Sequence, residues 1–390
     1  MKKDSLIVHA GRHPEQQFGA VNPPVYHAST ILHPSVAAME ASGKNPYEGV
    51  RYGRFGTPTT HAFEEAMAAV EGGGKTVATS SGLAAITGAL MAFLEAGDHL
   101  LMVDSAYFPT RKFCDKVLAG FGVETTYYDP RIGGDIGRLM RPNTKVVFTE
   151  SPGSLTFEVQ DLPAIAAAAH AGNAVVMIDN TWGVLNFQPF AHGVDISIQA
   201  CTKYVVGHAD AMLGAITCRD DLWLKVKDSV CTFGHSPGAD ELFLGLRGLR
   251  TLPVRLKRHA ETALRLASWL ESRPEVDRVL YPPLPSDPGH ALWRRDFTGA
   301  CGLFGLILKP ASKRAVDAML DGFRHFNLGY SWGGFESLVI PTTGHAIVRT
   351  ASEWAPEGPS LRFHAGLEDS DDLLADLEAG LGRLRAGAGD

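Results

Sequence analysis

The sequence lacks the long apolar runs that mark membrane and exported proteins. A membrane-spanning helix needs about 20 apolar residues, and a signal peptide needs a continuous apolar segment of its own. The amino-terminal stretch MKKDSLIVHAGRHPEQ has two lysines but only the short apolar piece Leu6–Val8 before polar residues return. We therefore expect neither a signal peptide nor a membrane span.

Cysteines are few and follow no regular spacing. The five cysteines are scattered, odd in number and never arranged as CxxC. Disulfide frameworks and structural zinc sites have characteristic cysteine spacings, so the pattern argues against both and favours a reducing cytoplasm. Their positions are Cys114, Cys201, Cys218, Cys231 and Cys301.

An excess of basic residues is also missing. The chain has 36 basic and 43 acidic side chains, a formal net charge of −7, and no run of lysine or arginine. Nucleic-acid binding proteins normally carry a basic patch, so this class is disfavoured. What is present is 45% hydrophobic and 20% charged residues over 390 positions, the mix of a soluble globular protein. This length predicts two or three domains, with enough apolar material for a large core and a subunit interface.

The pattern of elements changes near residue 58. Residues 1–57, with Asn22-Pro23-Pro24 and the cluster YEGVRYGRFGTPT, are too irregular to bury a core and are expected to lie as an arm against a neighbouring subunit. From about Thr59, short apolar strands alternate with helices, which predicts a parallel sheet covered on both faces. The predicted strands are TVATS, HLLMVDS, VETTYY, KVVFTE, AVVMIDN, ISIQACTK and AMLGAITC, and the predicted helices are HAFEEAMAAVE, Gly82 to Glu95, Phe108 to Leu118 and LPAIAAAAHAG.

The last third of the chain follows a different plan. A long amphipathic helix is predicted from Asp240 to Arg273, with Pro253 bending or interrupting it. A smaller α+β unit follows, with strands at CGLFGLILK and SLRFHAG, and a terminal helix begins after Asp369. The predicted division is an arm at 1–57, a first domain at 58–255 and a carboxyl-terminal domain at 256–390.

Two residues that suit pyridoxal phosphate (PLP) chemistry lie 24 positions apart. Asp179 ends the strand of MIDNTWG, and Lys203 lies in SIQACTKY. The carboxyl ends of parallel strands line the crevice in which such sheets bind ligands. There PLP needs a lysine for its Schiff base and an aspartate beside its ring nitrogen. Spacing alone leaves the alternative open, a strand-end aspartate that caps a turn and a surface lysine.

A phosphate-binding turn is predicted where TVATS passes into the next helix. The junction reads Ser80-Ser81-Gly82-Leu83, and free amides at a helix start favour an anion. Alone the signal is weak, because many such turns read Ser-Gly. Gly72-Gly73-Gly74-Lys75 lacks the ending of a Walker loop, and no GxGxxG follows a strand, so a nucleotide cofactor has little support.

Longer motifs resemble one enzyme family from nearly end to end. They match the Cys/Met-metabolism PLP enzymes in order and, within that family, are most similar to the bacterial cystathionine β-lyases. The resemblance implies an aspartate-aminotransferase-like α/β fold, fold type I of the PLP enzymes, with 58–255 as the PLP-binding domain. The matching segments are YGRFGTPT, TSSGLAAI, SAYFPTR, ESPGS, MIDNTW, SIQACTKYVVGHADAMLG, RGLRTLPVRL, YSWGGFESL and LRFHAGLEDSDDL.

The resemblance also assigns roles to residues that would hold PLP. Lys203 would form the Schiff base and act in catalysis, Asp179 would face the ring nitrogen, and Tyr107 would stack on the ring. The phosphate would be bound by Gly82, Leu83 and Thr202 and, from the adjacent subunit, by Tyr52 and Arg54. The arm therefore implies a homo-oligomer, at least a dimer with shared active sites and by expectation a tetramer. Tyr52 and Arg54 could instead be ordinary interface residues.

The substrate side follows in the same way. Arg362 would clamp the α-carboxylate with its two-pronged guanidinium, with Ser331, Trp332 and Tyr107 lining the site. Each has a plainer alternative, since Tyr107 could be a core aromatic and Arg362 could face solvent from a half-buried strand. No metal site is predicted, because His208 has no second histidine or cysteine at useful spacing and is better explained by loop packing. The direction in which Cys201 faces is left open.

Two positions depart from the family pattern. Many members have serine where this chain has Ala200, so one hydroxyl to the phosphate is expected to be missing. The β-lyases often have tyrosine where this chain has Phe243, which puts distal substrate contacts in doubt.

The implied activity is β-elimination from a sulfur amino acid, with L-cystathionine giving homocysteine, pyruvate and ammonia. A broader cysteine-conjugate β-lyase and the γ-acting sister enzymes are alternatives. Trp332 and the sequence SPGS both favour β-elimination, because the γ-enzymes usually have an aliphatic residue and an Asn-Pro-type sequence there. A noncatalytic regulatory protein on the same fold is disfavoured by the retained Lys203, Asp179 and Arg362, and a nicotinamide oxidoreductase is more distant still.

Overall fold

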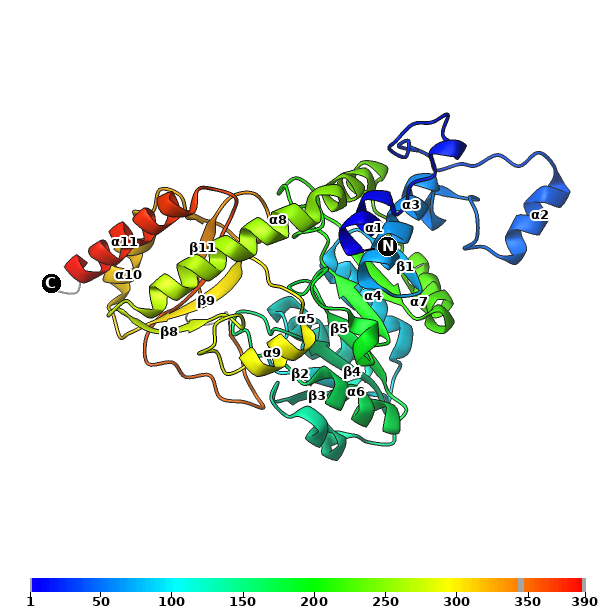
Figure 1. The fold of residues 1–390 in the computed structure, drawn as a ribbon. Helices are drawn as coiled ribbons and strands as arrows, with labels where there is room; N and C mark the ends of the chain where they lie inside the picture. Colours follow the sequence, from blue (N-terminus) through cyan, green and yellow to red (C-terminus); the bar gives the residue numbers. More distant parts are fainter. Residues whose placement is uncertain (1, 343–346, 388–390) are drawn as a thin grey trace.

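The protein folds around two β-sheets joined by one long helix (Figure 1). The structure is a computed structural model that describes residues 2–342 and 347–387. In this described part no helix is both long enough and apolar enough to cross a membrane.

The first sheet has seven strands in the order β1-β7-β6-β5-β4-β2-β3. Strands β2 to β6 pair in parallel, whereas β7 runs antiparallel to both β6 and β1. The predicted mostly parallel sheet is thus confirmed, with β7 as a reversed strand. The strand bounds are β1 Lys75–Thr79, β2 His99–Val103, β3 Glu124–Tyr128, β4 Thr144–Glu150, β5 Val175–Asp179, β6 Ile196–Gln199 and β7 Gly214–Cys218.

Helices cover both faces of this sheet, as the apolar strands predict. Alternate residues of β2 enter different cores, with Leu100 and Met102 in one cluster and Leu101 and Val103 in the other. Successive strand side chains point to opposite faces, so each face must be buried by its own helices. The helices are α3 Pro58–Glu71, α4 Gly82–Phe93, α5 Phe108–Phe113, α6 Leu162–Ala171 and α7 Asp220–Thr232, and a π-helical turn at Cys114–Leu118 extends α5.

The second sheet has five strands in the order β10-β11-β12-β9-β8. All of its pairs are antiparallel except β10 with β11. The bounds are β8 Val276–Leu280, β9 Leu303–Leu308, β10 Asn327–Leu328, β11 Leu338–Pro341 and β12 Ser360–His364, with helices α9 His290–Asp296, α10 Lys313–Asp321 and α11 Ser370–Gly387.

Helix α8 (Ala239–Glu271) connects the two sheets as a single element of 33 residues (Figure 1). It continues through Pro253 without a break, so of the two effects expected of this proline, interruption does not occur. The helix also crosses the predicted boundary between residues 255 and 256. The division at 57/58 and 255/256 therefore stays a proposal.

The first 57 residues contain more regular structure than their sequence suggests. Helix α1 (Lys3–His9) packs onto the body through the buried Ile7, whereas α2 (Val36–Lys44) projects away from it and has no buried residue (Figure 1). The Ser35 hydroxyl caps α2 by accepting a hydrogen bond from the amide of Ala38. Helices this short carry too few turns for an apolar periodicity to show, which is why the pattern did not predict them.

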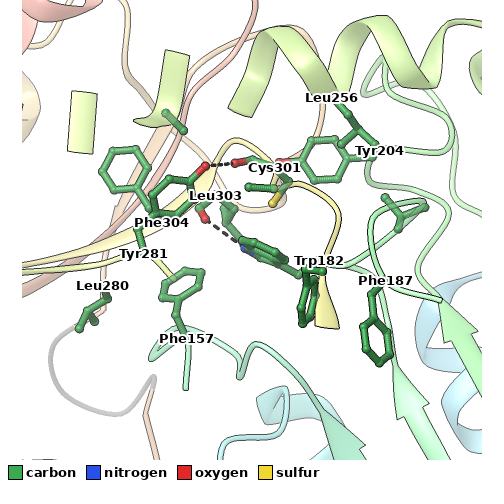
Figure 2. Close-up of a cluster of buried hydrophobic side chains, with 14 of the residues drawn as sticks. Phe157, Trp182, Phe187, Tyr204, Leu256, Leu280, Tyr281, Cys301, Leu303 and Phe304 are labelled. Atoms are coloured by element: carbon green, nitrogen blue, oxygen red, sulfur yellow. Dashed lines mark hydrogen bonds between the residues drawn. The ribbon is translucent and has the colours of Figure 1, made fainter. Parts of the chain in front are cut away.

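The core is shared between the two sheets (Figure 2). The Trp182 indole donates a hydrogen bond to the Leu303 carbonyl at 3.1 Å, and the Tyr204 hydroxyl accepts one from the Gly302 amide at 2.8 Å. Backbone groups of the second half of the chain thus satisfy the polar atoms of buried aromatic side chains of the first half.

Candidate active site

Asp179 and Lys203 meet at the carboxyl ends of adjacent strands. Strand β5 ends at Asp179, and β6 ends at Gln199, so Lys203 lies in the turn that follows rather than in the strand predicted for ISIQACTK. Asp179 is buried, and its Oδ1 accepts hydrogen bonds from both the amide and the hydroxyl of Thr181, at 3.0 and 2.5 Å. Burial raises the pKa of the Asp179 carboxyl, which the Thr181 bonds and the positive charge of Lys203 oppose.

The Lys203 amine is hydrogen-bonded to Ser331, which lies between β10 and β11 of the second sheet. Its Nζ donates to the Ser331 hydroxyl at 2.6 Å and lies 5.4 Å from the centre of the Trp332 ring. Burial, followed by the positive charge of Arg362, lowers the pKa of Lys203 to about 8, and the Asp179 carboxylate opposes the shift. The amine is therefore far easier to deprotonate than an ordinary lysine, as a catalytic base requires.

Arg362 approaches the same serine from strand β12. Its side chain is buried, and Nη2 donates to the Ser331 carbonyl at 2.8 Å. The Nε atom is also buried and has no hydrogen-bond partner within the described residues. The alternative of a solvent-facing arginine is thus wrong, and one donor of the guanidinium is free to bind a carboxylate.

The start of helix α4 is arranged to bind an anion. Ser81 is the N-cap, and its hydroxyl accepts from the amide of Ala84, which leaves the amides of Gly82 and Leu83 at the helix start outside this cap. A side chain at Gly82 would put its Cβ 2.5 Å from the Cβ of Ala200, so only glycine allows this close approach. Ala200 therefore lies where a serine hydroxyl would reach the start of α4.

Tyr107 presents its ring at the site and is not a core aromatic. The side chain is 45% exposed, and its backbone amide donates to Oε2 of Glu150 at 2.7 Å. Burial, together with the charge of Asp179, raises the pKa of the Glu150 carboxyl well above its ordinary value. Glu150 was not predicted as a site residue, because its bond to Tyr107 joins two strand ends 43 positions apart.

A cavity of about 660 Å³ lies between the turn after β6 and the loop of Ser331, and its lining does not include Lys203, Asp179, Arg362 or Tyr107. It contains the predicted Thr202, Ser331 and Trp332, and also acidic residues that the sequence did not single out, among them Asp210 and Glu241. The Thr202 hydroxyl already exchanges hydrogen bonds with the backbone of Leu213, which fixes the turn after β6.

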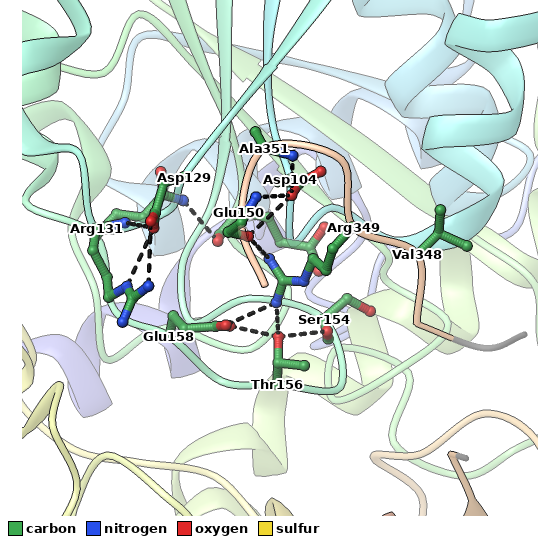
Figure 3. Close-up of polar contacts among 12 residues, drawn as sticks. Asp104, Asp129, Arg131, Glu150, Ser154, Thr156, Glu158, Val348, Arg349 and Ala351 are labelled. Atoms are coloured by element: carbon green, nitrogen blue, oxygen red, sulfur yellow. Dashed lines mark hydrogen bonds and ion pairs between the residues drawn. The ribbon is translucent and has the colours of Figure 1, made fainter. Parts of the chain in front are cut away.

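A segment from the carboxyl-terminal part is fastened to the first sheet near Tyr107 (Figure 3). The carboxylate of Asp104, just after β2, accepts hydrogen bonds from the amides of Thr350, Ala351 and Ser352. Arg349 forms an ion pair with Glu158 at 2.8 Å. These contacts connect residues about 190 to 250 positions apart and were not predicted.

Tyr52 and Arg54 do not join the site of their own chain. Arg54 donates to the Cys231 carbonyl at 2.6 Å, near the end of α7, and Tyr52 is 42% exposed.

Two other expectations concern loop residues. His208 bonds the Val206 carbonyl through Nδ1 at 2.7 Å, which is local loop packing, and Cys201 is fully buried in the core.

These groups fit PLP. An amine of lowered pKa, a buried carboxylate, an exposed aromatic ring and a helix start with two uncapped amides are the chemical partners of its aldehyde, ring nitrogen, ring face and phosphate. The unpartnered Arg362 Nε adds a donor for a carboxylate.

Comparison with known proteins identifies the family. The family model of the Cys/Met metabolism PLP-dependent enzymes matches residues 4–382. This chain belongs to that family. It is 44% identical to cystathionine beta-lyase MetC of Escherichia coli, over 98% of this chain and 99% of that protein. It is also 38% identical to an L-alanine/L-glutamate racemase of Wolbachia pipientis, over 98% of both chains.

Solved structures agree with this assignment. The crystal structure of metB from Corynebacterium glutamicum superposes with a TM-score of 0.91 at 30% identity, covering 98% of both chains. The chain is thus a PLP-dependent enzyme of fold type I, which confirms the fold, the cofactor and the family that its motifs predicted.

Proposed function

We propose that this Cys/Met-metabolism enzyme cleaves the Cβ–S bond of L-cystathionine and releases homocysteine, pyruvate and ammonia. The observation that carries the proposal is that Ser331 binds two cationic side chains. Its hydroxyl accepts a hydrogen bond from Lys203, and its carbonyl accepts one from Arg362. A base for the Cα proton and a clamp for the α-carboxylate are thereby fixed relative to one another. The 44% identity to the cystathionine beta-lyase of E. coli favours this substrate.

The roles of the residues follow from their chemistry. Bound at this site, PLP would withdraw electrons from the substrate's α-carbon. Arg362 would bind the α-carboxylate, and Lys203 would remove the Cα proton because its lowered pKa leaves a larger neutral fraction than an ordinary lysine has. Loss of that proton allows the thiolate on Cβ to depart. Asp179 would hold the protonated ring nitrogen, and Gly82, Leu83 and Thr202 would bind the phosphate.

β-Elimination is favoured over γ-elimination by the groups near Lys203. A γ-acting enzyme must move a second proton at Cβ, and the family's γ-enzymes usually carry an aliphatic residue where this chain has Trp332. The Trp332 ring lies 5.4 Å from the Lys203 amine and packs on Tyr204. The bulky, fixed ring therefore restricts the space next to the base, as a single proton transfer allows.

Product analysis tests this function. The purified enzyme is incubated with L-cystathionine, and keto acids and thiols are identified, with Lys203→Ala as the inactive control. Pyruvate with homocysteine is the expected result. Formation of 2-oxobutyrate with cysteine would show γ-elimination instead of β-elimination. Turnover of cystine or other cysteine conjugates, without turnover of L-cystathionine, would contradict the proposed substrate. Incubation with L-alanine and chiral analysis tests the racemase activity named among the relatives.

We also propose that the active unit is at least a dimer with shared sites, assembled into a tetramer. Tyr52 and Arg54 lie on the arm and outside their own cavity, and α2 has no buried residue within its own chain. A neighbouring copy would provide the packing surface that α2 lacks within its own chain, and the arm would bring Tyr52 and Arg54 to the neighbour's phosphate site.

A further inference from the structure

The loop that carries Ser331 and Trp332 has an unusual backbone. Ser331 has a φ of 74°, a left-handed conformation that is uncommon for a residue other than glycine. Gly333 follows with a φ of 86°, and a Cβ there would lie 2.9 Å from the backbone of Lys203 and of Tyr204. The loop therefore sits directly on the backbone of the catalytic lysine. Such strained backbone persists only where surrounding contacts hold it.

His364 supplies two of those contacts from behind the loop. It is the last residue of β12, two positions after Arg362, so both side chains leave the same face of the strand. Its Nε2 accepts a hydrogen bond from the Gly333 amide at 3.1 Å, and its Nδ1 bonds the Glu336 carbonyl at 3.1 Å. One ring thus fastens both ends of the stretch from Gly333 to Glu336.

These two partners define the protonation state of His364. A carbonyl oxygen can only accept, so Nδ1 must carry the proton, and an amide can only donate, so Nε2 must be bare. The ring is fully buried and packs against His259 and Tyr204. Burial, and then the nearby His259, Arg362 and Lys203, hold the pKa of His364 well below its ordinary value. The neutral ring that the loop requires is the form that its surroundings favour.

We propose that His364 is a positioning residue for the β-elimination. By accepting the hydrogen bond of the Gly333 amide, His364 keeps the Ser331 hydroxyl in position to accept a hydrogen bond from the Lys203 amine. The inference rests on the proposed function for its substrate, but its structural part concerns only the loop. Loosening the loop would disturb the bonds of Ser331 to both Lys203 and Arg362, but Arg362 is also anchored by its own strand β12. Loss of the His364 bonds should therefore affect the proton-transfer step more than capture of the carboxylate.

A set of variants separates the two ring nitrogens. His364→Gln can place a carbonyl oxygen near the position of Nε2 and so keep an acceptor for Gly333. His364→Asn is shorter, and its amide can replace only Nδ1. We expect His364→Asn to lower kcat about 10- to 100-fold with KM within about threefold of wild type, and His364→Gln to stay within about threefold in both.

His259→Phe is the matched control. His259 is buried beside His364, with 5.2 Å between the ring centres, but its Nδ1 bonds the Ala365 carbonyl instead of the loop. We expect its kcat to stay within about threefold of wild type. A drop in kcat that follows melting temperature or PLP content across all three variants would overturn the proposal, as would His364→Gln being as impaired as His364→Asn.

Hydrogen exchange gives a readout that needs no substrate. Mass spectrometry of the peptide covering residues 329–337 should show faster exchange in His364→Asn than in wild type, and no change in His259→Phe. Unchanged exchange in His364→Asn would contradict the role of His364 whatever the kinetics. If wild type released no pyruvate from cystathionine, the proposed function would fail, and the exchange result would still decide whether His364 holds the loop.

Discussion

At the scale of single residues, the site is dominated by two cations, the half-buried Lys203 and the buried Arg362, that donate to a common serine. Lys203 and Arg362 raise the cost of each other's charge, and the positive charge of Arg362 is one reason for the lowered pKa of Lys203. Burial also lowers the pKa of Arg362 to about 10. A substrate carboxylate bound to Arg362 would offset that positive charge. The amine would then hold a proton more tightly, so substrate binding would raise the pKa of Lys203, which makes the neutral amine a stronger base but reduces its neutral fraction.

The pH dependence of Lys203 labelling tests this coupling. In the PLP-free protein, a small amine-reactive reagent should label Lys203 faster as the pH rises, with a midpoint near pH 8. Removing a nearby positive charge favours the protonated amine, so Arg362→Met should move the midpoint upward. Labelling is quantified by peptide mass spectrometry across a pH series. A wild-type midpoint near 10.5, or a downward shift in Arg362→Met, would contradict the coupling.

Arg362→Ala should mainly impair substrate capture. Hydrogen bonds to a charged group are worth about 1.5–3 kcal/mol, so kcat/KM should fall about tenfold to a hundredfold. Arg362→Lys keeps the charge but not the planar fork, and it should recover only part of the loss. Steady-state kinetics with L-cystathionine measure both variants, and PLP titration serves as the control. Weakened PLP binding with a normal KM would assign Arg362 to the cofactor instead.

At the scale of elements, the junction from β1 to α4 depends on how closely the helix approaches the turn after β6. A Cβ at Gly82 would lie 2.5 Å from the Cβ of Ala200, which belongs to that turn. A larger residue at either position would push the helix start away from Thr202. The small residues at Gly82 and Ala200 thus align two elements that the sequence separates by more than 100 positions.

Gly82→Ala should therefore weaken PLP binding. The added Cβ would lie 2.5 Å from that of Ala200, which displaces the start of α4 and its two uncapped amides. We expect the dissociation constant of PLP to rise about tenfold or more, with activity largely restored at saturating PLP. Gly88→Ala, on the same helix, is the control because its Cβ would meet only the end of the Val230 side chain at 3.0 Å. Equal PLP affinities in both variants would refute this role for Gly82.

The elements that the sequence predicted are those in which buried positions recur at regular intervals along the chain. Strands β1, β2, β4, β5 and β6 and helices α3, α4 and α6 have regular apolar patterns, and the strand that ends at Asp179 was predicted together with its ligand-binding role. The reversed direction of β7 was not, because one strand's periodicity is the same in either direction. Partners such as Thr181, Glu150 and His364 were missed because their importance lies in contacts that only the folded chain creates.

At the scale of the whole molecule, the proposed dimer would divide the site between subunits. Arg54 contacts α7 of its own chain and not its own cavity. If the arm serves the neighbouring copy, no single chain holds a complete set of phosphate contacts. This property can be tested by counting intact sites in mixed assemblies.

Mixtures of Arg54→Ala and Lys203→Ala chains should regain activity. In a mixed dimer, one site collects both substitutions and the other has neither, so each heterodimer should reach about half of wild-type activity if sites act independently. The chains are refolded together with different affinity tags, and the doubly tagged fraction is assayed. No gain in that fraction would mean that Arg54 acts within its own subunit and that the arm only stabilises the assembly.

The core shared by the two sheets also governs how the protein can be made. Trp182 and Tyr204 leave the ribosome well before Gly302 and Leu303, the residues that satisfy their polar atoms. Until then the Trp182 indole lacks the Leu303 carbonyl that it bonds in the folded core (Figure 2). A nascent chain that stalls near residue 300 is consequently a target for chaperones and proteases rather than a working cofactor-binding fragment. Quality control thus acts on the enzyme as a single unit, although it contains two sheets.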